Sequence, residues 1–113
     1  MARKAEYHLE EWRRLGALCL YDADLLAKRL RVSRRTLERT MREALGSSPQ
    51  DWLKMERINA SPDLLLKLRC AKVVAFRLGF KQLSQFSRDF KRRHGLSPRA
   101  FLARADRQTL VAD

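Results

Sequence analysis

The sequence predicts an all-α fold of about seven helices, in which a unit of helix, tight turn and helix occurs twice. Apolar residues recur at intervals of three and four, as on one face of a helix, and no segment alternates apolar and polar residues as a strand does. The segment 33–53, SRRTLERTMREALGSSPQDWL, returns at 82–102 as QLSQFSRDFKRRHGLSPRAFL, so that Gly95 follows Gly46 by 49 residues. A repeat at a fixed offset indicates a duplicated structural unit.

The duplication also predicts the domain organisation. A chain of 113 residues is long enough for one domain, or for two very small lobes that share a connection. We expect a first subdomain at 1–47, a linker helix at 48–68 and a second subdomain at 69–113.

The ends of the expected helices are marked by capping residues. Asp22 and Ser33 are good N-caps, and Ser48 and Ser97 each precede a proline, which suits the first helical position. Glycine at the end of a helix adopts the left-handed conformation without steric cost. We expect helices at 5–18, 23–30, 34–45, 49–60, 63–68, 71–78, 83–94 and 98–105. The ranges 49–60 and 63–68 are two parts of the linker helix. The tail after residue 105 is expected to fray.

Pro62 lies inside the expected linker helix. A proline within a helix loses one hydrogen bond and clashes with the preceding turn, which costs about 3 kcal/mol. The segment Ser61-Pro62-Asp63 is also a good helix start. The sequence therefore predicts a kink or a restart at this point.

The chain is strongly basic, with 25 Lys plus Arg against 13 Asp plus Glu and a net charge of +12. A charge of this size in a short chain favours a polyanionic partner, although solubility alone is the simpler explanation. Because the charge is concentrated on particular helix faces, nucleic acid is the favoured interpretation.

Other composition signals exclude several classes of protein. Cys19 and Cys70 are too few for a disulfide framework, and no Cys/His cluster suggests a metal site. No apolar run approaches the roughly 20 residues of a membrane span, and the N-terminal segment has no signal-peptide core. We expect a protein of a reducing cytosol with no metal, no cofactor, no membrane and no small-molecule ligand in this chain.

The second helix of each repeat has one apolar and one polar face. Leu37 and Met41 are four apart, as are Phe86 and Phe90, so each pair shares the face that anchors its helix. The opposite face carries groups that can hydrogen-bond to base edges in a major groove. The candidates for base contacts are Arg35, Glu38, Arg39, Ser84, Ser87 and Arg88. Cations beside or later on the same helices suit phosphate contacts; these are Arg34, Arg42, Lys81, Lys91, Arg92 and Arg93.

Three of these positions need separate argument. Arg39 and Arg88 occupy equivalent places in the two copies, which favours a shared role over that of two solvated surface arginines. Glu38 leaves two interpretations open: it reads a cytosine amino group, or it pairs with Arg35 or Arg42 at helical spacing.

With these motifs in their order and spacing, residues 22–102 resemble the AraC/XylS family of bacterial transcription regulators. The resemblance is carried by S-x-x-x-L-x-R-x-M at 33–41, R-I at 57–58, V-A at 74–75, G-F-x-x-x-S-x-F-S-R-x-F-K at 79–91, and G-x-S-P at 46–49 and 95–98. It implies two helix-turn-helix subdomains on a linker helix, binding adjacent major-groove segments in a bacterial cytoplasm, and contact with RNA polymerase. It also implies that the six base-contact candidates face the DNA. The chain departs from the family pattern at Pro62, at Cys70 in place of a Ser/Thr cap, and at Gln82 in place of Asp.

Three classes of function remain to be compared. The first is sequence-specific binding of duplex DNA for transcription regulation. The second is a cationic helical RNA-binding or architectural module, against which the regular repeat argues. The third is an enzyme; His8 and His94 lie far apart in sequence with no evident nucleophile or carboxylate partner, so we expect no catalysis, and His94 is expected to interact with a helix dipole.

Overall fold

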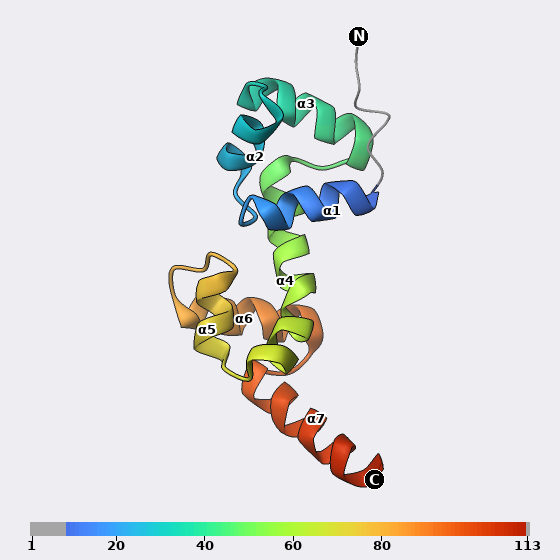
Figure 1. The fold of residues 1–113 in the computed structure, drawn as a ribbon, viewed down its shortest axis with the longest axis vertical. Coiled ribbons are helices and arrows are strands. Elements are labelled where there is room, and N and C mark those ends of the chain that lie inside the picture. Colours follow the sequence, from blue (N-terminus) through green and yellow to red (C-terminus); the bar gives the residue numbers. More distant parts are fainter. Residues whose placement is uncertain (1–8, 113) are drawn as a thin grey trace. The chain divides into compact units, whose positions relative to one another are not determined.

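The structure, a computed structural model, describes the backbone of residues 9–112 and the side chains of residues 9–109 (Figure 1). The described residues form seven helices and no strand, so the predicted all-α fold is confirmed. The helices are α1 Leu9–Leu18, α2 Ala23–Leu30, α3 Arg34–Leu45, α4 Pro49–Leu68, α5 Ala71–Arg77, α6 Leu83–His94 and α7 Pro98–Ala112. Residues 5–8, where the first helix was expected to begin, lie outside the described part.

The chain divides into two compact units, and the boundary between Arg57 and Ile58 falls inside α4. The first unit contains α1, α2, α3 and the first part of α4. The second contains the rest of α4 with α5, α6 and α7. Each unit has its own buried apolar residues, as the sequence repeat leads one to expect.

The core of the first unit is built from one face of each of its helices. Trp12 of α1, Leu26 of α2, Met41 of α3 and Leu53 of α4 are all at most 1% exposed and belong to one cluster. Gly16 allows α1 to lie close to α4, since a Cβ atom at this position would stand 3.0 Å from Cδ2 of Leu53. The predicted inward face of α3 is therefore its buried face.

A salt bridge also joins α1 to α4 in the first unit. Nε of Arg13 donates to Oε1 of Glu56 at 3.0 Å, and Nη1 donates to Glu10 at 3.2 Å. The hydrogen bond to the Glu10 carboxylate and the charge of Glu56 raise the pKa of Arg13 above its ordinary value. The guanidinium group thus bridges the two helices.

The core of the second unit is aromatic. Phe90 has its ring centroid 5.8 Å from that of Phe86, 5.6 Å from that of Phe101 and 4.6 Å from that of His94. The rings of Phe80 and Phe86 are 5.2 Å apart. Tilted and edge-on ring pairs at these distances add to the apolar burial that anchors α6.

The helix α4 runs without interruption through Pro62, so the restart expected from Ser61-Pro62-Asp63 does not occur. Pro62 lacks the N–H that would bond to the carbonyl oxygen of Ile58 one turn earlier. That oxygen accepts a hydrogen bond from Oγ of buried Ser61 at 2.6 Å, and it lies 3.0 Å from Nε2 of His94. Substitute donors allow the helix to continue past the proline.

Helix capping differs between the two copies. In the first, Oδ1 of Asp22 accepts from the start of α2, and Oγ of Ser33 accepts from N of Thr36 at 3.0 Å. In the second, neither Cys70 before α5 nor Gln82 before α6 makes a side-chain cap hydrogen bond. At the helix that follows α3 or α6 the two copies agree, because Ser48 and Ser97 cap α4 and α7 through their hydroxyl groups.

The last helix is longer than expected. Residues after 105 were predicted to fray, but α7 continues to Ala112. Arg69, which precedes α5, is hydrogen-bonded to Asp106 on α7 through its Nη2 atom. This ion pair holds the middle of α7 to the rest of the second unit.

Candidate nucleic-acid interface

The polar face of α3 is open to solvent. Leu37 and Met41 are at most 1% exposed, and the base-contact candidates Arg35, Glu38 and Arg39 are all exposed. Arg42, predicted to contact phosphate, is exposed one turn later. A helix with this division can rest on its own unit while its other face meets a ligand.

The helix α6 repeats this arrangement. Phe86 and Phe90 are fully buried, and on the outer side Ser84 and Arg88 are exposed while Ser87 is partly buried. The expected phosphate-contacting cations of this copy are also exposed: Lys81, Lys91, Arg92 and Arg93. The last turn of α6 is therefore strongly cationic.

Arg34 is less available than the sequence suggested. Its Nη1 atom donates to Oδ1 of Asp24 on α2 at 2.5 Å. The ion pair joins the first and second helices of the repeat, and the Arg34 side chain is 39% exposed. The predicted phosphate contact of Arg34 therefore competes with a contact that holds α3 against α2.

A chain of hydrogen bonds orients Arg88. Its Nη2 atom donates to Oε1 of Gln85 at 2.9 Å, and Nε2 of Gln85 donates to Oδ1 of Asp89 at 2.8 Å. Arg92 lies 3.7 Å from the same carboxylate oxygen. The Asp89 side chain is only 11% exposed, so its carboxylate is a well-packed acceptor that holds Gln85, and through Gln85 the Arg88 side chain, in place.

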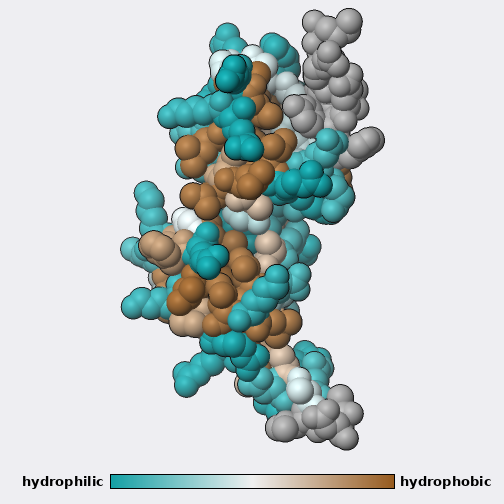
Figure 2. Space-filling model, viewed as in Figure 1, coloured by the Kyte–Doolittle hydropathy of each residue, from teal (hydrophilic) through white to brown (hydrophobic). Residues whose placement is uncertain are grey.

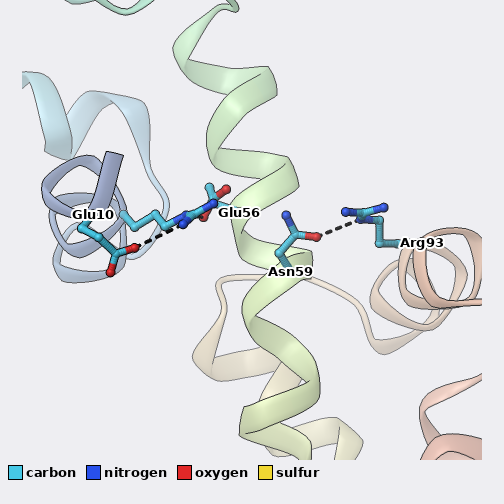
Figure 3. Close-up of polar contacts among 5 residues, drawn as sticks. Glu10, Glu56, Asn59 and Arg93 are labelled. Carbon is cyan, nitrogen blue, oxygen red and sulfur yellow. Dashed lines mark hydrogen bonds and ion pairs between the residues drawn. The ribbon is translucent and has the colours of Figure 1, made fainter. Parts of the chain in front are cut away.

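Arg93 also has a partner inside its own unit. Its Nε atom donates to Oδ1 of Asn59 on α4 at 2.8 Å, as Figure 3 shows. This contact, like that of His94 with Ile58, ties the end of α6 to α4. Arg93 therefore has a structural contact besides its predicted phosphate contact.

The structure shows no ion pair between Glu38 and the arginines that the sequence offered as its partners. Within the described residues its carboxylate forms no ion pair with Arg35 or Arg42. The carboxylate is exposed on the same face as Arg39. A contact with a base amino group stays a prediction for this side chain.

Sequence reasoning missed the residues that hold the candidate side chains. Gln85 and Asp89 were not identified, although Gln85 lies three residues before Arg88 and four before Asp89, the spacing at which helical side chains meet. That spacing was the available signal. Asp24 and Asn59 were also missed, and these contacts join different helices, so no local pattern reveals them.

Neither a metal-binding cluster nor a membrane-spanning helix is found within residues 9–112. No group of three or more His, Cys, Asp or Glu side chains is placed to hold a metal ion there. Both cysteines are free thiols, Cys19 buried and Cys70 exposed, and burial raises the pKa of Cys19. None of the described helices combines the length and hydropathy that a membrane crossing requires.

Comparison with known proteins identifies the domain family. A family model described as a helix-turn-helix domain matches residues 26–104, which is more than half of the chain and includes both α3 and α6. No solved structure matches the chain at a significant level. The chain therefore belongs to the AraC-type helix-turn-helix domain family, whose members bind DNA in transcription regulation.

Proposed function

We propose that the chain is a sequence-specific DNA-binding module of a bacterial AraC/XylS regulator, and that α3 and α6 enter adjacent major-groove segments of one duplex. The observation that carries the proposal is the duplicated polar face. Arg39 and Arg88 are exposed at equivalent positions of two helices whose opposite faces are buried by Leu37 and Met41 or by Phe86 and Phe90.

Each side chain has a distinct role in this proposal. Arg39 and Arg88 bond to guanine O6 and N7, and Glu38 accepts from a cytosine amino group. Arg35, Ser84 and Ser87 make the remaining base contacts. The phosphate contacts come from Arg42, Lys81, Lys91 and Arg92, with Arg34 and Arg93 reaching phosphates only if they give up their contacts with Asp24 and Asn59.

The proposed organisation follows the repeat. Residues 1–47 and 69–113 form the two helix-turn-helix subdomains, and 48–68 is the linker helix that both share. The bacterial cytoplasm, contact with promoter-bound RNA polymerase, and action by binding and not by catalysis are further parts of the proposal. They are supported by the resemblance to AraC/XylS regulators and by the non-enzymatic character of the matched family.

Selection from a randomised duplex pool, followed by footprinting, tests the proposal. Two recognition helices on one face of the duplex should select two half-sites about one helical turn, roughly 34 Å, apart. Inserting about 5 base pairs between the half-sites should abolish the paired footprint. Inserting about 10 should not restore it, because α4, at 20 residues and about 1.5 Å per residue, is too short to bridge the additional turn of DNA. Enrichment of no sequence, or equal binding of RNA and random duplex, would favour the alternative cationic RNA-binding or architectural module.

Salt dependence gives an independent check. Raising the salt concentration from 50 to 200 mM should reduce the affinity for DNA by roughly 10² if four of the assigned cations contact phosphates, and by roughly 10³ if Arg34 and Arg93 also do. A shallow salt dependence would contradict the assigned set of phosphate contacts.

A further inference from the structure

An exposed apolar groove lies on the second unit between α5 and the start of α6. Its volume is about 370 Å³, and it is lined by Val73, Phe76, Phe80 and Leu83 together with Lys72 and Lys81. The side chain of Phe76 is 82% exposed, and those of Val73 and Leu83 are each 43% exposed. Figure 2 shows apolar surface on this unit, with hydrophilic side chains around it.

The other copy of the repeat shows that the fold does not need this groove. The position of Phe76 corresponds to Lys28 on α2, and that of Leu83 to Arg34 on α3, at the repeat offsets of 48 and 49 residues. The first unit forms the same two helices with a solvated lysine and an Asp24–Arg34 ion pair at these positions. Exposed apolar side chains at Phe76 and Leu83 therefore need an explanation other than folding.

The charges around the groove indicate what would cover it. Lys72 and Lys81 line it, and no carboxylate does. A second copy of a chain with net charge +12 would bring further cations toward these lysines. The phosphates of DNA could pair with Lys72 and Lys81, but they would leave the Phe76 ring exposed to water. A surface that carries both apolar and acidic side chains satisfies both parts of the groove.

We propose that this groove, centred on Phe76, docks an acidic amphipathic helix of a partner protein. The apolar stripe of the helix covers Phe76, Val73 and Leu83, and its carboxylates meet Lys72 and Lys81. This is the helix-in-groove mode of recognition, with a single aromatic side chain as the anchor. The site lies beside the proposed DNA contacts of α6 and shares Lys81 with them, but its apolar residues Phe76, Val73 and Leu83 have no part in those contacts.

A synthetic peptide tests the proposal on the full chain without DNA. The probe is a labelled helical peptide of about 15 residues, with Leu at i, i+3, i+4 and i+7 and Glu at most other positions. Its affinity is measured by fluorescence anisotropy, and its footprint by amide chemical shifts. Saturable binding with shifts confined to α5 and the start of α6 is the expected result. Binding no tighter than that of a scrambled peptide of equal charge overturns the proposal.

Substitutions at one position separate groove binding from general charge attraction. Phe76→Gln leaves the net charge unchanged and should weaken peptide binding at least about tenfold. Phe76→Lys introduces the residue that the first unit already accommodates, and it should weaken binding similarly. The matched control is Lys28→Phe, which should not reduce peptide affinity. Unchanged binding by Phe76→Gln contradicts the proposal.

Two further measurements distinguish the other occupants. Phe76→Gln should leave the affinity for the selected duplex within about twofold; a loss as large as that of Arg88→Ala would assign the groove to DNA. Sedimentation of the wild-type chain should show no self-association that Phe76→Gln abolishes; such self-association would assign the groove to a second copy. Because peptide binding is measured without DNA, failure of the DNA-binding proposal leaves this result interpretable.

Discussion

Nε2 of His94, the last residue of α6, lies 3.0 Å from the carbonyl oxygen of Ile58 in α4. That oxygen is the one left without a helical N–H by Pro62. A donor from the end of one helix therefore compensates for a proline in another, with the hydroxyl group of Ser61 as the second donor. The contact also explains why an apparently unhelpful proline is compatible with an unbroken α4.

This relationship predicts energetic coupling between His94 and Pro62. His94→Ala should lower the free energy of unfolding by about 1–2 kcal/mol through the lost hydrogen bond and ring packing. In a Pro62→Ala background, the restored N–H satisfies the same carbonyl, so the cost of His94→Ala should fall by about 1 kcal/mol. Urea unfolding of the four variants in a double-mutant cycle measures the coupling. Equal costs of His94→Ala in both backgrounds would show that the carbonyl does not link the two residues.

Removal of the two equivalent arginines tests base recognition directly. Arg39→Ala and Arg88→Ala should each weaken binding to the selected duplex by about 1–3 kcal/mol and relax the preference at one base position. Arg107→Ala, an exposed arginine of α7, is the control and should change binding only slightly. If the first two variants weaken specific and random duplex equally, the base-reading assignment is wrong.

The hydrogen-bond chain of α6 predicts a positioning role for Gln85. Gln85→Ala removes the acceptor of Arg88 without removing the guanidinium group. The variant should lose part of the specificity lost by Arg88→Ala, and it should have little further effect once Arg88 is alanine. Competition binding with duplexes altered at the Arg88-dependent position measures this. Additive losses in the double variant would show that Gln85 does not act through Arg88.

The uncapped start of α6 predicts opposite effects of one substitution on stability and on binding. Gln82→Asp supplies a cap that α6 lacks and should raise the free energy of unfolding by about 1 kcal/mol. Its charge at a DNA-facing helix terminus should weaken DNA binding through repulsion by phosphate. The matched control is Ser33→Asp at the equivalent position of α3, where a cap already exists. It should weaken DNA binding without a comparable gain in stability; a similar gain in both variants would contradict the argument.

The two thiols are predicted to differ in reactivity. Cys70 is exposed, whereas Cys19 is 4% exposed and burial raises its thiol pKa, which lowers the thiolate fraction at neutral pH. A disulfide reagent at pH 7 should modify Cys70 rapidly in the folded chain and Cys19 only after unfolding of the first unit. Cys70→Ser, which removes the fast phase, identifies the two sites. Rapid modification of both thiols in the folded wild-type chain would contradict this prediction, because it would show that the core of the first unit opens readily to the reagent.

The sequence predicted what depends on local pattern and repetition. Helix ends followed from Asp22, Ser33 and the Ser-Pro pairs, and the buried faces of α3 and α6 followed from residues four apart. The restart at Pro62 was wrong because the compensating donor His94 is 36 residues from Ile58, beyond any local pattern.

The candidate site was predictable only in part for the same reason. Periodicity places Arg39 and Arg88 on exposed faces, and the structure has both exposed. It does not show that Arg34 is held by Asp24 or Arg93 by Asn59, because those contacts depend on how helices pack. The base and phosphate contacts themselves remain predictions.

Each of the two units contains part of α4, which matters for the design of fragments of the chain. Leu53 is buried in the first core, while Ile58 and Leu65 are buried in the second unit. A fragment that ends at residue 47 would lack Leu53, and a fragment that begins at residue 69 would lack Ile58 and Leu65. Each fragment would therefore lose part of the core of the unit that it was meant to isolate. Only a fragment that keeps its own stretch of this helix would retain a complete interior, so half-molecules should be designed to overlap within 49–68.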